Sequence, residues 1–539
     1  MSGPERNDNV LAHMIRTRAE RSPDLDVLTF EHLSLDGGAT PDEIRTYADL
    51  EVNANRLARA LIERGMGHGD RFALMMRNHP EFVEALIAAS ITGTVAVPID
   101  PRTKGEKLSF MLADAGCSGV VCGDYSLPAV DVARPAMGPR SWVLALRTGE
   151  NGSPDLDVFA GVDSLAGALQ GPEVSVDVRL RSPGDPLQII YTSGTTGDPK
   201  GVVFPNERFG MFAMLGHLLG YGPTERPYTG LSLTHGNAQA TTLAPSLSLG
   251  LRAVFSRRFT KSRLWDVCRR HGCTVFSLLG GMATAIYSEP HRPDDSENPV
   301  RFVVSAGMPP AIWEAFEERF AVSVFEWYGA VEGGLAFKPI GEGPVGSFGR
   351  PAPGLDMRIL DENDEECPPG VPGEICSRPA GGGRATVEYH GKPEASEAKT
   401  RGGWLRSGDI GHTDAEGWFF FDHRKGGGLR HNGDFVNPGF VEKVIAEHPQ
   451  VDDVFVYGVP AASGAPGEKD IVAAITAVDP ARFDPDSVFE TCAAGLEPNF
   501  VPTYLQVVDG IPKTASEKPQ ERFLAEAFGP DADGVFTRP

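Results

Sequence analysis

The segment from Tyr191 to Val202, YTSGTTGDPKGV, contains the residue types that hold a polyphosphate. Its glycines let backbone N–H groups approach phosphate oxygens, its hydroxyls donate further hydrogen bonds, and Lys200 neutralises negative charge. It is not a Walker A loop, because no Gly-Lys-Ser/Thr follows at the required spacing. A polar surface turn is the alternative interpretation. The triphosphate interpretation names as ligands Thr192, Ser193, Gly194, Thr195, Thr196, Gly197 and Lys200.

This string closely resembles the phosphate-binding signature of the acyl-adenylating superfamily, which contains acyl-CoA synthetases, the adenylation domains of peptide synthetases and luciferase. Further family motifs follow in family order up to Lys518, so the resemblance covers nearly the whole chain. It implies an ATP-dependent acid–CoA ligase that forms acyl-AMP and pyrophosphate, then acyl-CoA and AMP. The implied ligands are a small carboxylic acid, ATP, Mg²⁺ and coenzyme A as co-substrate.

Glu332 ends the segment Trp-Tyr-Gly-Ala-Val-Glu, which resembles the family's Tyr-Gly-x-Thr-Glu. The resemblance implies that Glu332 holds the magnesium of ATP, with Thr196 as a second ligand. Magnesium prefers carboxylate and phosphate oxygens. Val331 replaces the family's threonine and removes one donor to phosphate, and a solvated surface acid is the alternative for Glu332. The expected nucleotide contacts in this segment are Tyr328, Gly329, Ala330 and Val331.

Two further motifs resemble those that bind adenosine in the family. Residues 305–309 lie between a strand-like run (300–304) and a helix-like run (311–320), and α/β sheets place ligands at the carboxyl ends of strands. This turn resembles the adenine-binding turn and implies contacts from Gly307, Met308 and Pro309. Asp409, in Arg-Ser-Gly-Asp, resembles the family's ribose-binding aspartate, whose carboxylate accepts hydrogen bonds from both ribose hydroxyls.

Lys518 ends the segment Pro-Lys-Thr-Ala-Ser-Glu-Lys, which resembles the family's Pro-x-Thr-x-Ser-Gly-Lys. The resemblance implies a catalytic lysine. Carboxylate attack on a phosphate builds negative charge, and a mobile cation lowers that barrier electrostatically. Glu517 replaces the family's glycine, and a solvated lysine near a tail is the alternative.

The segment His423 to Gly428, HRKGGG, predicts a flexible joint, because three consecutive glycines follow an aromatic strand-like run. It resembles the family's hinge, with Lys425 at the pivot. The resemblance implies that Arg424 also reaches the ribose. It further implies that Arg430 and Gly433, in Arg-His-Asn-Gly, line the path of CoA after the small domain rotates.

His235 opens the segment His-Gly-Asn-Ala-Gln, which is similar to the crotonobetaine/carnitine-CoA ligase branch of the family. The resemblance implies a gate at the acyl pocket, and a packed core histidine is the alternative. Gly280 and Gly281 suggest room, and segments 235–239, 277–281 and 327–330 contain no lysine or arginine for a second carboxylate. We therefore expect a bulky aromatic or alicyclic monoacid, while a carnitine-like acid stays open. The expected acid-binding residues are His235, Asn237, Gln239, Leu279, Gly280 and Trp327.

The elements that position these residues alternate between helix and strand patterns. Residues 47–65 form one apolar helical face, 71–76 read as a strand, and Asn78 is placed to cap a helix from Pro80 to about Ala89. Such alternation predicts an α/β fold with parallel-rich sheets. Beyond the hinge, a pattern of a helix, two strands, a second helix and a strand predicts a small mobile α+β domain. The predicted domains are 1–422, which binds ATP and acid, the hinge 423–428, and a lid, 429–539.

Composition excludes several classes of protein. The chain has 539 residues, a net charge of −23 and seven cysteines. The negative charge disfavours general affinity for nucleic acid or anionic membrane. No apolar signal core stands at the start, no stretch is long enough to span a membrane, and an odd number of cysteines without CxxC pairs predicts reduced thiols. We expect a cytoplasmic protein, and a homodimer is one assembly that the family resemblance allows.

Two other functions fit the same motifs. The first is a stand-alone adenylation enzyme that loads an acyl group onto a carrier-protein phosphopantetheine, although no carrier domain is fused here. The second is a catalytically degraded homologue that binds nucleotide, which the departures at Val331 and Glu517 would explain. Retention of the five charged residues of the motifs argues against the second: Lys200, Glu332, Asp409, Arg424 and Lys518.

Overall fold

A computed structural model describes residues 6–150, 152–192, 199–424, 429–431, 434–436, 438–462, 469–496, 498–514 and 517–538. The chain forms two compact units. Unit 1 consists of Met1–Ser277 with Thr386–Lys399, and unit 2 consists of Leu278–Ala385 with Thr400–Pro539. Each unit is described by itself.

Unit 1 contains a seven-stranded sheet in the order β7-β6-β5-β3-β4-β8-β9. All neighbouring strands are parallel except the antiparallel pair β8 and β9. The strands of this sheet are near-continuous runs of apolar residues, as expected for a parallel sheet, because such a sheet is buried on both faces. The strands are β3 (Arg71–Met75), β4 (Val95–Pro98), β5 (Cys117–Gly123), β6 (Trp142–Leu146), β7 (Val162–Ser164), β8 (Pro186–Thr192) and β9 (Lys200–Pro205).

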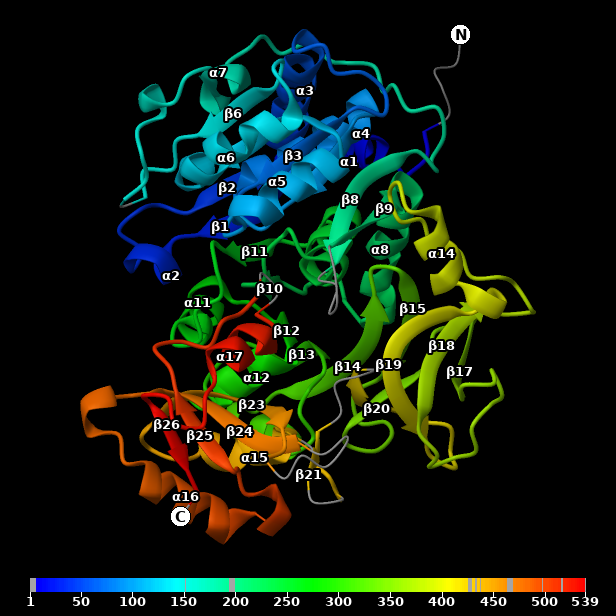
Figure 1. The fold of residues 1–539 in the computed structure, drawn as a ribbon. Helices are drawn as coiled ribbons and strands as arrows, with labels where there is room; N and C mark the ends of the chain where they lie inside the picture. Colours follow the sequence, from blue (N-terminus) through cyan, green and yellow to red (C-terminus); the bar gives the residue numbers. More distant parts are fainter. Residues whose placement is uncertain are drawn as a thin grey trace. The chain divides into compact units, whose positions relative to one another are not determined.

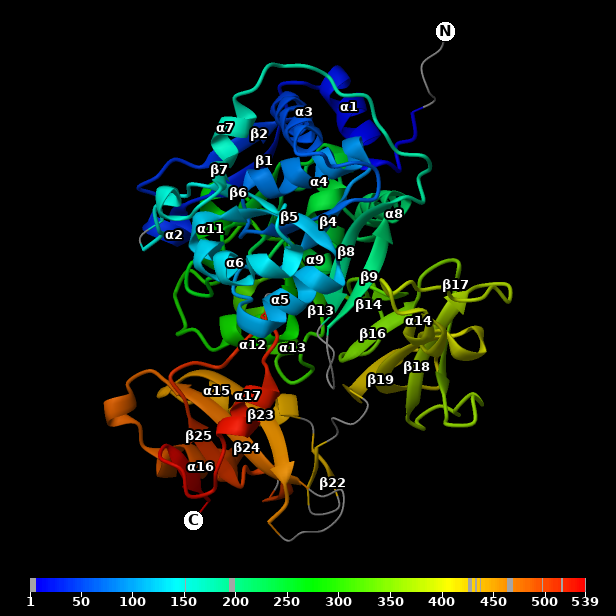
Figure 2. The same cartoon turned by 45° about the horizontal axis from the view of Figure 1, so that its top comes forward.

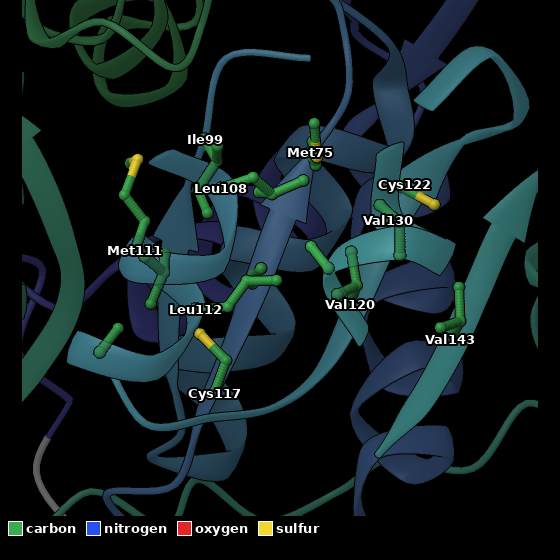
Figure 3. Close-up of a cluster of buried hydrophobic side chains, with 14 of the residues drawn as sticks. Met75, Ile99, Leu108, Met111, Leu112, Cys117, Val120, Cys122, Val130 and Val143 are labelled. Atoms are coloured by element: carbon green, nitrogen blue, oxygen red, sulfur yellow. The ribbon is translucent and has the colours of Figure 1, made fainter. Parts of the chain in front are cut away.

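Helices cover both faces of this sheet. Helices α5 (Gly105–Asp114) and α6 (Leu127–Ala133) lie along one face (Figures 1 and 2) and bury a common apolar cluster against β3, β5 and β6. Figure 3 draws side chains of this cluster, among them Leu108 and Met111 of α5, Val130 of α6 and the strand residues Met75, Val120 and Val143. Helices α3 (Tyr47–Glu63) and α4 (Pro80–Thr92) pack together, and every residue of α4 is buried.

The remainder of unit 1 carries a second group of strands. Strands β10 (Pro227–Thr229), β11 (Ala253–Ser256) and β1 (Asp26–Glu31) are parallel, and β2 (Glu43–Thr46) is antiparallel to β1. The first residues of β12 (Val275–Leu279) pair with β10. The other helices of unit 1 are α1 (Leu11–Arg21), α2 (Leu33–Asp36), α7 (Leu165–Leu169), α8 (Asn206–Leu218), α9 (Gly236–Ala238), α10 (Ala244–Leu249), α11 (Leu264–His271) and α14 (Pro393–Lys399).

Unit 2 begins with α12 (Gly280–Tyr287) and continues into a strongly twisted run of strands in the order β13-β14-β15-β16-β20-β19-β18-β17 (Figure 1). Only β13 and β14 are parallel; the other neighbours are antiparallel. The elements are β13 (Phe302–Ala306), α13 (Trp313–Phe320), β14 (Ser323–Ala330), β15 (Gly333–Lys338), β16 (Ser347–Pro351), β17 (Leu355–Leu360), β18 (Gly373–Pro379), β19 (Leu405–Thr413) and β20 (Phe419–Arg424).

The C-terminal part of unit 2 has a core of its own. Strands β23 (Val451–Pro460), β24 (Lys469–Ala477), β25 (Tyr504–Val507) and β26 (Val535–Thr537) form a four-stranded sheet. Helices α15 (Pro438–Ala446) and α16 (Pro485–Gly495) bury their apolar residues on it. The short strands β21 (Arg430–His431) and β22 (Asp434–Phe435) and helix α17 (Glu521–Ala527) complete this part. The predicted α/β class with a small α+β C-terminal region is confirmed.

One local prediction is wrong. Asn78 does not cap α4, whose N-cap is His79. The Asn78 amide instead donates to the carbonyls of Leu231 and Ser256, both at 2.8 Å, and its oxygen accepts from the Leu233 N–H. A fully buried asparagine is worth more as a cross-link between loops than as a cap, because both ends of its amide are then satisfied.

The structure bears on two further predictions, one about membrane-spanning segments and one about the redox state of the cysteines. In the parts of the chain that the structure describes, no helix combines the length and the apolarity that a membrane span requires. All seven cysteines are free and buried, in agreement with the prediction of reduced thiols.

Candidate active site

The predicted phosphate segment joins two paired strands of unit 1. Strand β8 ends at Thr192, strand β9 begins at Lys200, and these two residues are register partners. The Thr192 hydroxyl lies 3.4 Å from the Lys200 carbonyl. Both ends of the loop are therefore fixed by the same antiparallel ladder. The loop's other predicted ligands lie outside the described residues: Ser193, Gly194, Thr195, Thr196 and Gly197.

A segment from far along the chain supports this loop and was missed by sequence reasoning. The Lys200 ammonium lies 5.5 Å from the centre of the Tyr389 ring. Lys392, at the start of α14, places its ammonium 3.3 Å from the Asp114 carboxylate and 3.4 Å from the Pro199 carbonyl. Asp114 also accepts a hydrogen bond of 2.7 Å from Tyr191. These residues hold the end of β8 and the start of β9 in place. No local sequence pattern indicates this role, because Tyr389 and Lys392 lie in a segment that looks like any lead-in to a helix.

The predicted ribose site of unit 2 is assembled by three strands. Asp409 on β19 and Arg424 on β20 are register partners, and the Arg424 Nε lies 2.7 Å from the Asp409 carboxylate. The Tyr328 hydroxyl on β14 donates to the same carboxylate at 2.6 Å. Burial and the neighbouring Asp409 charge raise the pKa of Tyr328, so its hydroxyl stays protonated as a donor. Asp409 is 5% exposed, so its carboxylate is buried and held in place by residues of the neighbouring strands.

Lys518 lies in the field of the same cluster. Burial lowers the pKa of Lys518, the Arg424 charge lowers it further, and the Asp409 charge raises it. Its loop rests on α12, because a Cβ built on Gly281 would lie 3.2 Å from the Glu517 carbonyl. Within unit 2 the structure thus brings together four residues that the sequence predicted from four separate segments: Tyr328, Asp409, Arg424 and Lys518.

The predicted adenine turn follows β13 in unit 2. Gly307 has a φ of +93°, a conformation open to glycine. Glu326 on β14, which sequence reasoning missed, accepts hydrogen bonds from the backbone N–H groups of Gly307 and Met308. Its spacing two residues before Tyr328 on a strand was the available signal, since alternate residues share a face. Pro309, the third predicted contact, is half-buried beside them.

Glu332 lies in the tight turn between β14 and β15, after Tyr328, Gly329, Ala330 and Val331. Gly333 and Gly334 follow with φ of +142° and +75°, so the backbone reverses there without strain. Glu332 is half-buried. A carboxylate on such a turn is the ligand type that Mg²⁺ takes from proteins when phosphate oxygens and water complete its shell. The donor chemistry fits the predicted metal role, while Thr196 lies outside the described residues.

The predicted acid segment of unit 1 forms a short irregular helix. His235 is the N-cap of α9, and its Nδ1 accepts from the Asn237 N–H at 3.2 Å. A π-helical turn, Gln239–Leu243, follows directly. Such turns re-aim side chains and often occur at functional sites. The Asn237 side chain is 5% exposed, and its Nδ2 has no partner among the residues that the structure describes.

Gln239 is placed differently from the prediction that it binds the acid. Its side chain is fully buried, and its amide exchanges hydrogen bonds of 2.7 and 3.2 Å with Gln188. It also donates to the Leu233 carbonyl at 2.8 Å. All of its strong hydrogen-bonding capacity is therefore used inside unit 1, which makes it a support for the segment.

Gly280 and Gly281 do not provide the room that the sequence suggested. A Cβ on Gly280 would lie 2.3 Å from the Gly307 carbonyl, and one on Gly281 would meet the lysine loop. These glycines are explained by close backbone approach within unit 2. Leu279, at the end of β12, and Trp327, on β14, are half-buried, and the Trp327 Nε1 is a buried donor without a partner in the described part of the chain.

The predicted hinge and CoA residues are only partly described. His423 and Arg424 belong to β20, and Lys425 and Gly426 to Gly428 lie outside the described residues. Arg430 is on β21, where its backbone pairs with Phe435, and Gly433 lies outside the described residues. The hinge and the domain limits built on it stay predictions.

Comparison with known proteins decides the family. Residues 15–384 match the model of the AMP-binding enzyme family, and residues 441–518 match that of the AMP-binding enzyme C-terminal domain. The chain belongs to the AMP-binding enzyme family. The resemblance to acyl-adenylating enzymes is thereby confirmed, as is the prediction of an ATP-using enzyme of the AMP-forming acyl-CoA synthetase type.

Relatives over nearly the full length act on chemically different acids by name. The chain is 29% identical to a sulfoacetate–CoA ligase of Cupriavidus necator, with 95% of this chain and 96% of the relative covered. It is 28% identical to a crotonobetaine/carnitine–CoA ligase of Proteus mirabilis, with 89% and 92% covered. It is 28% identical to a medium/long-chain-fatty-acid–CoA ligase of Mycobacterium marinum, with 92% of each covered.

Solved structures show the same fold. An anthranilate CoA ligase superposes with a TM-score of 0.80 at 22% identity, covering 96% of this chain and 97% of that chain. A benzoate CoA ligase from Burkholderia xenovorans gives a TM-score of 0.77 at 22% identity, covering 96% and 99%. At this identity the likeness concerns the fold alone.

Proposed function

We propose that this chain joins a bulky aromatic or alicyclic monocarboxylic acid to coenzyme A. The single observation that carries the adenylating step is the cluster of Tyr328, Asp409, Arg424 and Lys518 in unit 2. It provides an acceptor for ribose hydroxyls and a cation within the field of that acceptor. The choice of a monoacid is supported by the absence of lysine and arginine from the three segments predicted to line the acid pocket.

In the first half-reaction a carboxylate oxygen of the acid bonds to the α-phosphorus of ATP, and the bond to the β-phosphate bridge oxygen breaks. Pyrophosphate leaves with the electron pair. Asp409 and Tyr328 hold the ribose end, and Lys518 stabilises the negative charge that builds on the phosphoryl oxygens. Glu332 and Thr196 would hold Mg²⁺, which would further neutralise the phosphate charge.

In the second half-reaction the CoA thiolate attacks the acyl carbon and AMP leaves. The first step converts a poor leaving group, oxide, into a good one, AMP. His235 is proposed to border the acyl carbon, and Arg430 and Gly433 to bind CoA. The Lys518 loop lies against Gly281 of α12, and it is proposed to withdraw after adenylation.

The test is acid-dependent release of pyrophosphate and AMP from MgATP across aliphatic, aromatic, alicyclic and betaine acids, with and without CoA. We expect turnover only with an aromatic or alicyclic acid, and a thioester detected by mass when CoA is present. Turnover with a fatty or betaine acid would refute the acid class and keep the ligase. Pyrophosphate release without thioester would indicate a carrier-protein acceptor. ATP binding without turnover on any acid would indicate a degraded enzyme.

A further inference from the structure

A buried carboxylate lies behind the adenine turn without belonging to any recognised motif. Glu326 sits in the middle of β14 and is 3% exposed. Its register partner on β15 is Lys338, whose ammonium lies 4.7 Å from the centre of the Trp313 ring. Burying an acid at this depth costs free energy unless hydrogen bonds compensate it. The position therefore calls for a reason beyond packing.

The Glu326 carboxylate binds the turn through its backbone. It accepts a short hydrogen bond from the Gly307 N–H and a bond of 3.2 Å from the Met308 N–H. On the other side, the Gly307 carbonyl approaches Gly280 so closely that a Cβ there would lie 2.3 Å away. The turn is thus clamped between a carboxylate and the first residue of α12, and Gly307 keeps its φ of +93°.

The same strand also fixes the ribose site. Glu326 and Tyr328 are two residues apart on β14, so their side chains share one face of the sheet. Glu326 holds the adenine turn, and Tyr328 donates to Asp409 at 2.6 Å. One rigid strand therefore sets the spacing between the base end and the ribose end of the nucleotide.

We propose that Glu326 is a positioning residue for the adenine base, which acts by holding the backbone of Gly307 and Met308 where the base binds. This inference rests on the proposed role of residues 307–309. It predicts that loss of the carboxylate weakens binding of ATP while the acid still binds normally.

Burial and one charged neighbour set the pH behaviour of this group. Burial raises the pKa of Glu326 to about 8, against its ordinary 4.5, while the two N–H donors and the Lys338 charge on β15 act in the opposite direction. Burial lowers the pKa of Lys338, and the charges of Glu317 on α13 and of Glu326 act in the opposite direction. Because Glu326 holds its proton more tightly in the folded state, its contribution to stability is greatest at acid pH and declines as pH rises toward about 8.

The experiment compares Glu326→Gln with wild type by titrating ATP into the full-length protein without acid, and by initial rates. At a pH above about 8, where the wild-type carboxylate is charged, we expect a Kd and KM for ATP about tenfold higher in the variant, because hydrogen bonds to a charged acceptor are lost. The KM for the acid should stay unchanged and kcat should fall less than threefold, a small factor next to loss of a transition-state contact. Wild-type affinity for ATP should improve as pH rises through about 8, and that of the variant should not.

Thermal stability tests the ionisation of Glu326 separately from its effect on ATP binding. Glutamine does not ionise, so Glu326→Gln should gain melting temperature relative to wild type as pH rises toward about 8, even though it binds ATP less well. Glu317→Gln is the matched control, because Glu317 also accepts from a backbone N–H, that of Val324 at 2.7 Å, and does not touch the turn.

Three results would overturn the proposal: an unchanged Kd for ATP in folded Glu326→Gln, an equal loss in Glu317→Gln, or a rise in the KM for the acid that matches the rise for ATP. Each of these is measured on ATP binding or on relative KM values. Failure of the proposed function instead shows as wild-type protein that binds ATP and turns over none of the aromatic or alicyclic acids.

Discussion

The nucleotide cluster of unit 2 and the acid segment of unit 1 use polar side chains in opposite ways. In the cluster, Asp409 is buried and surrounded by Tyr328 and Arg424, charged and polar groups that converge on one carboxylate. In the acid segment, the Gln239 amide bonds to Gln188 and Leu233, and the Nδ2 of Asn237 is a buried donor without a partner among the described residues. We therefore expect the first region to recognise its ligand by charge, and the second to recognise the acid by shape around a few donors.

This difference explains why relatives can share a nucleotide site and still take unlike acids. A site that binds its ligand by charge needs fixed residue types at fixed positions, so its motifs can be recognised in the sequence. A site shaped by packed walls can change with single side chains, because a methylene in an apolar pocket is worth only about 1–3 kcal/mol. The names of the relatives, which range from sulfoacetate to fatty acids, agree with this.

Among the changes that test this difference between the two regions, removal of the cation of the cluster, Lys518, should have the largest effect on activity. Lys518→Ala should lower the rate of acid-dependent pyrophosphate release by about a hundredfold or more, as expected for loss of a preorganised transition-state charge. The KM for ATP should change little, because the cation acts on the charge that builds during the reaction. Stopped assays of pyrophosphate at saturating ATP measure this.

Two controls sharpen that prediction. Lys513→Ala removes another lysine of the same segment, which pairs with Asp453 at 2.5 Å, and should leave the rate within a fewfold of wild type. Conversion of synthetic acyl-AMP to acyl-CoA should survive in Lys518→Ala, because adenylation is bypassed. Equal losses in both lysine variants would mean that the loop, and not the charge of Lys518, matters.

The ribose carboxylate should show the next largest effect. Asp409→Asn keeps the shape but replaces one acceptor oxygen by an N–H₂ group that faces the Tyr328 hydroxyl and Arg424. We expect the KM for ATP to rise about tenfold or more, since hydrogen bonds to charged groups contribute about 1.5–3 kcal/mol. Asp422→Asn on β20, which pairs with the half-buried His412 at 3.0 Å, is the control and should leave the KM for ATP unchanged.

In the acid segment, we expect Gln239 to contribute mainly to stability and Asn237 mainly to binding of the acid. Gln239→Ala should lower the free energy of unfolding by about 1–3 kcal/mol, because the buried Gln188 amide and Leu233 carbonyl lose their partner. Asn237→Ala should cost less stability and should raise the KM for the acid several-fold if its Nδ2 binds the substrate. Chemical denaturation and acid titrations measure the two effects. A larger stability loss in Asn237→Ala than in Gln239→Ala would reverse the assignment.

The sequence predicted the cluster well for a physical reason. Asp409, Arg424 and Lys518 stand in motifs whose residue types are dictated by charge, and strand pairing brings Asp409 and Arg424 together. Tyr389 acts through its ring face, which leaves no local pattern, so its role emerges only in three dimensions. Glu326 acts through backbone contacts, and its place two residues before Tyr328 on β14 was its one signal in the sequence. Gly280 illustrates the opposite error: a glycine in a predicted pocket reads as space, yet the Gly307 carbonyl fills it. The cap of α4 was misplaced because a tertiary contact outcompeted a local one at Asn78.

The smallest expected effect concerns Glu517, which lies next to Lys518, departs from the family's motif and has a strained backbone conformation. Glu517 has a φ of +56°, in the left-handed region that favours the glycine of the resembled motif. A side chain there costs about 1 kcal/mol, which glycine would relieve at some expense in unfolded-chain entropy. Glu517→Gly should therefore raise the free energy of unfolding by up to about 1 kcal/mol and leave the KM for ATP unchanged. Glu517→Ala removes the carboxylate but keeps the Cβ, so it should give no gain in thermal denaturation. If both variants gain equally, the carboxylate beside Lys518 is the source of the cost, and the lysine loop of the cluster is destabilised by charge rather than by backbone conformation.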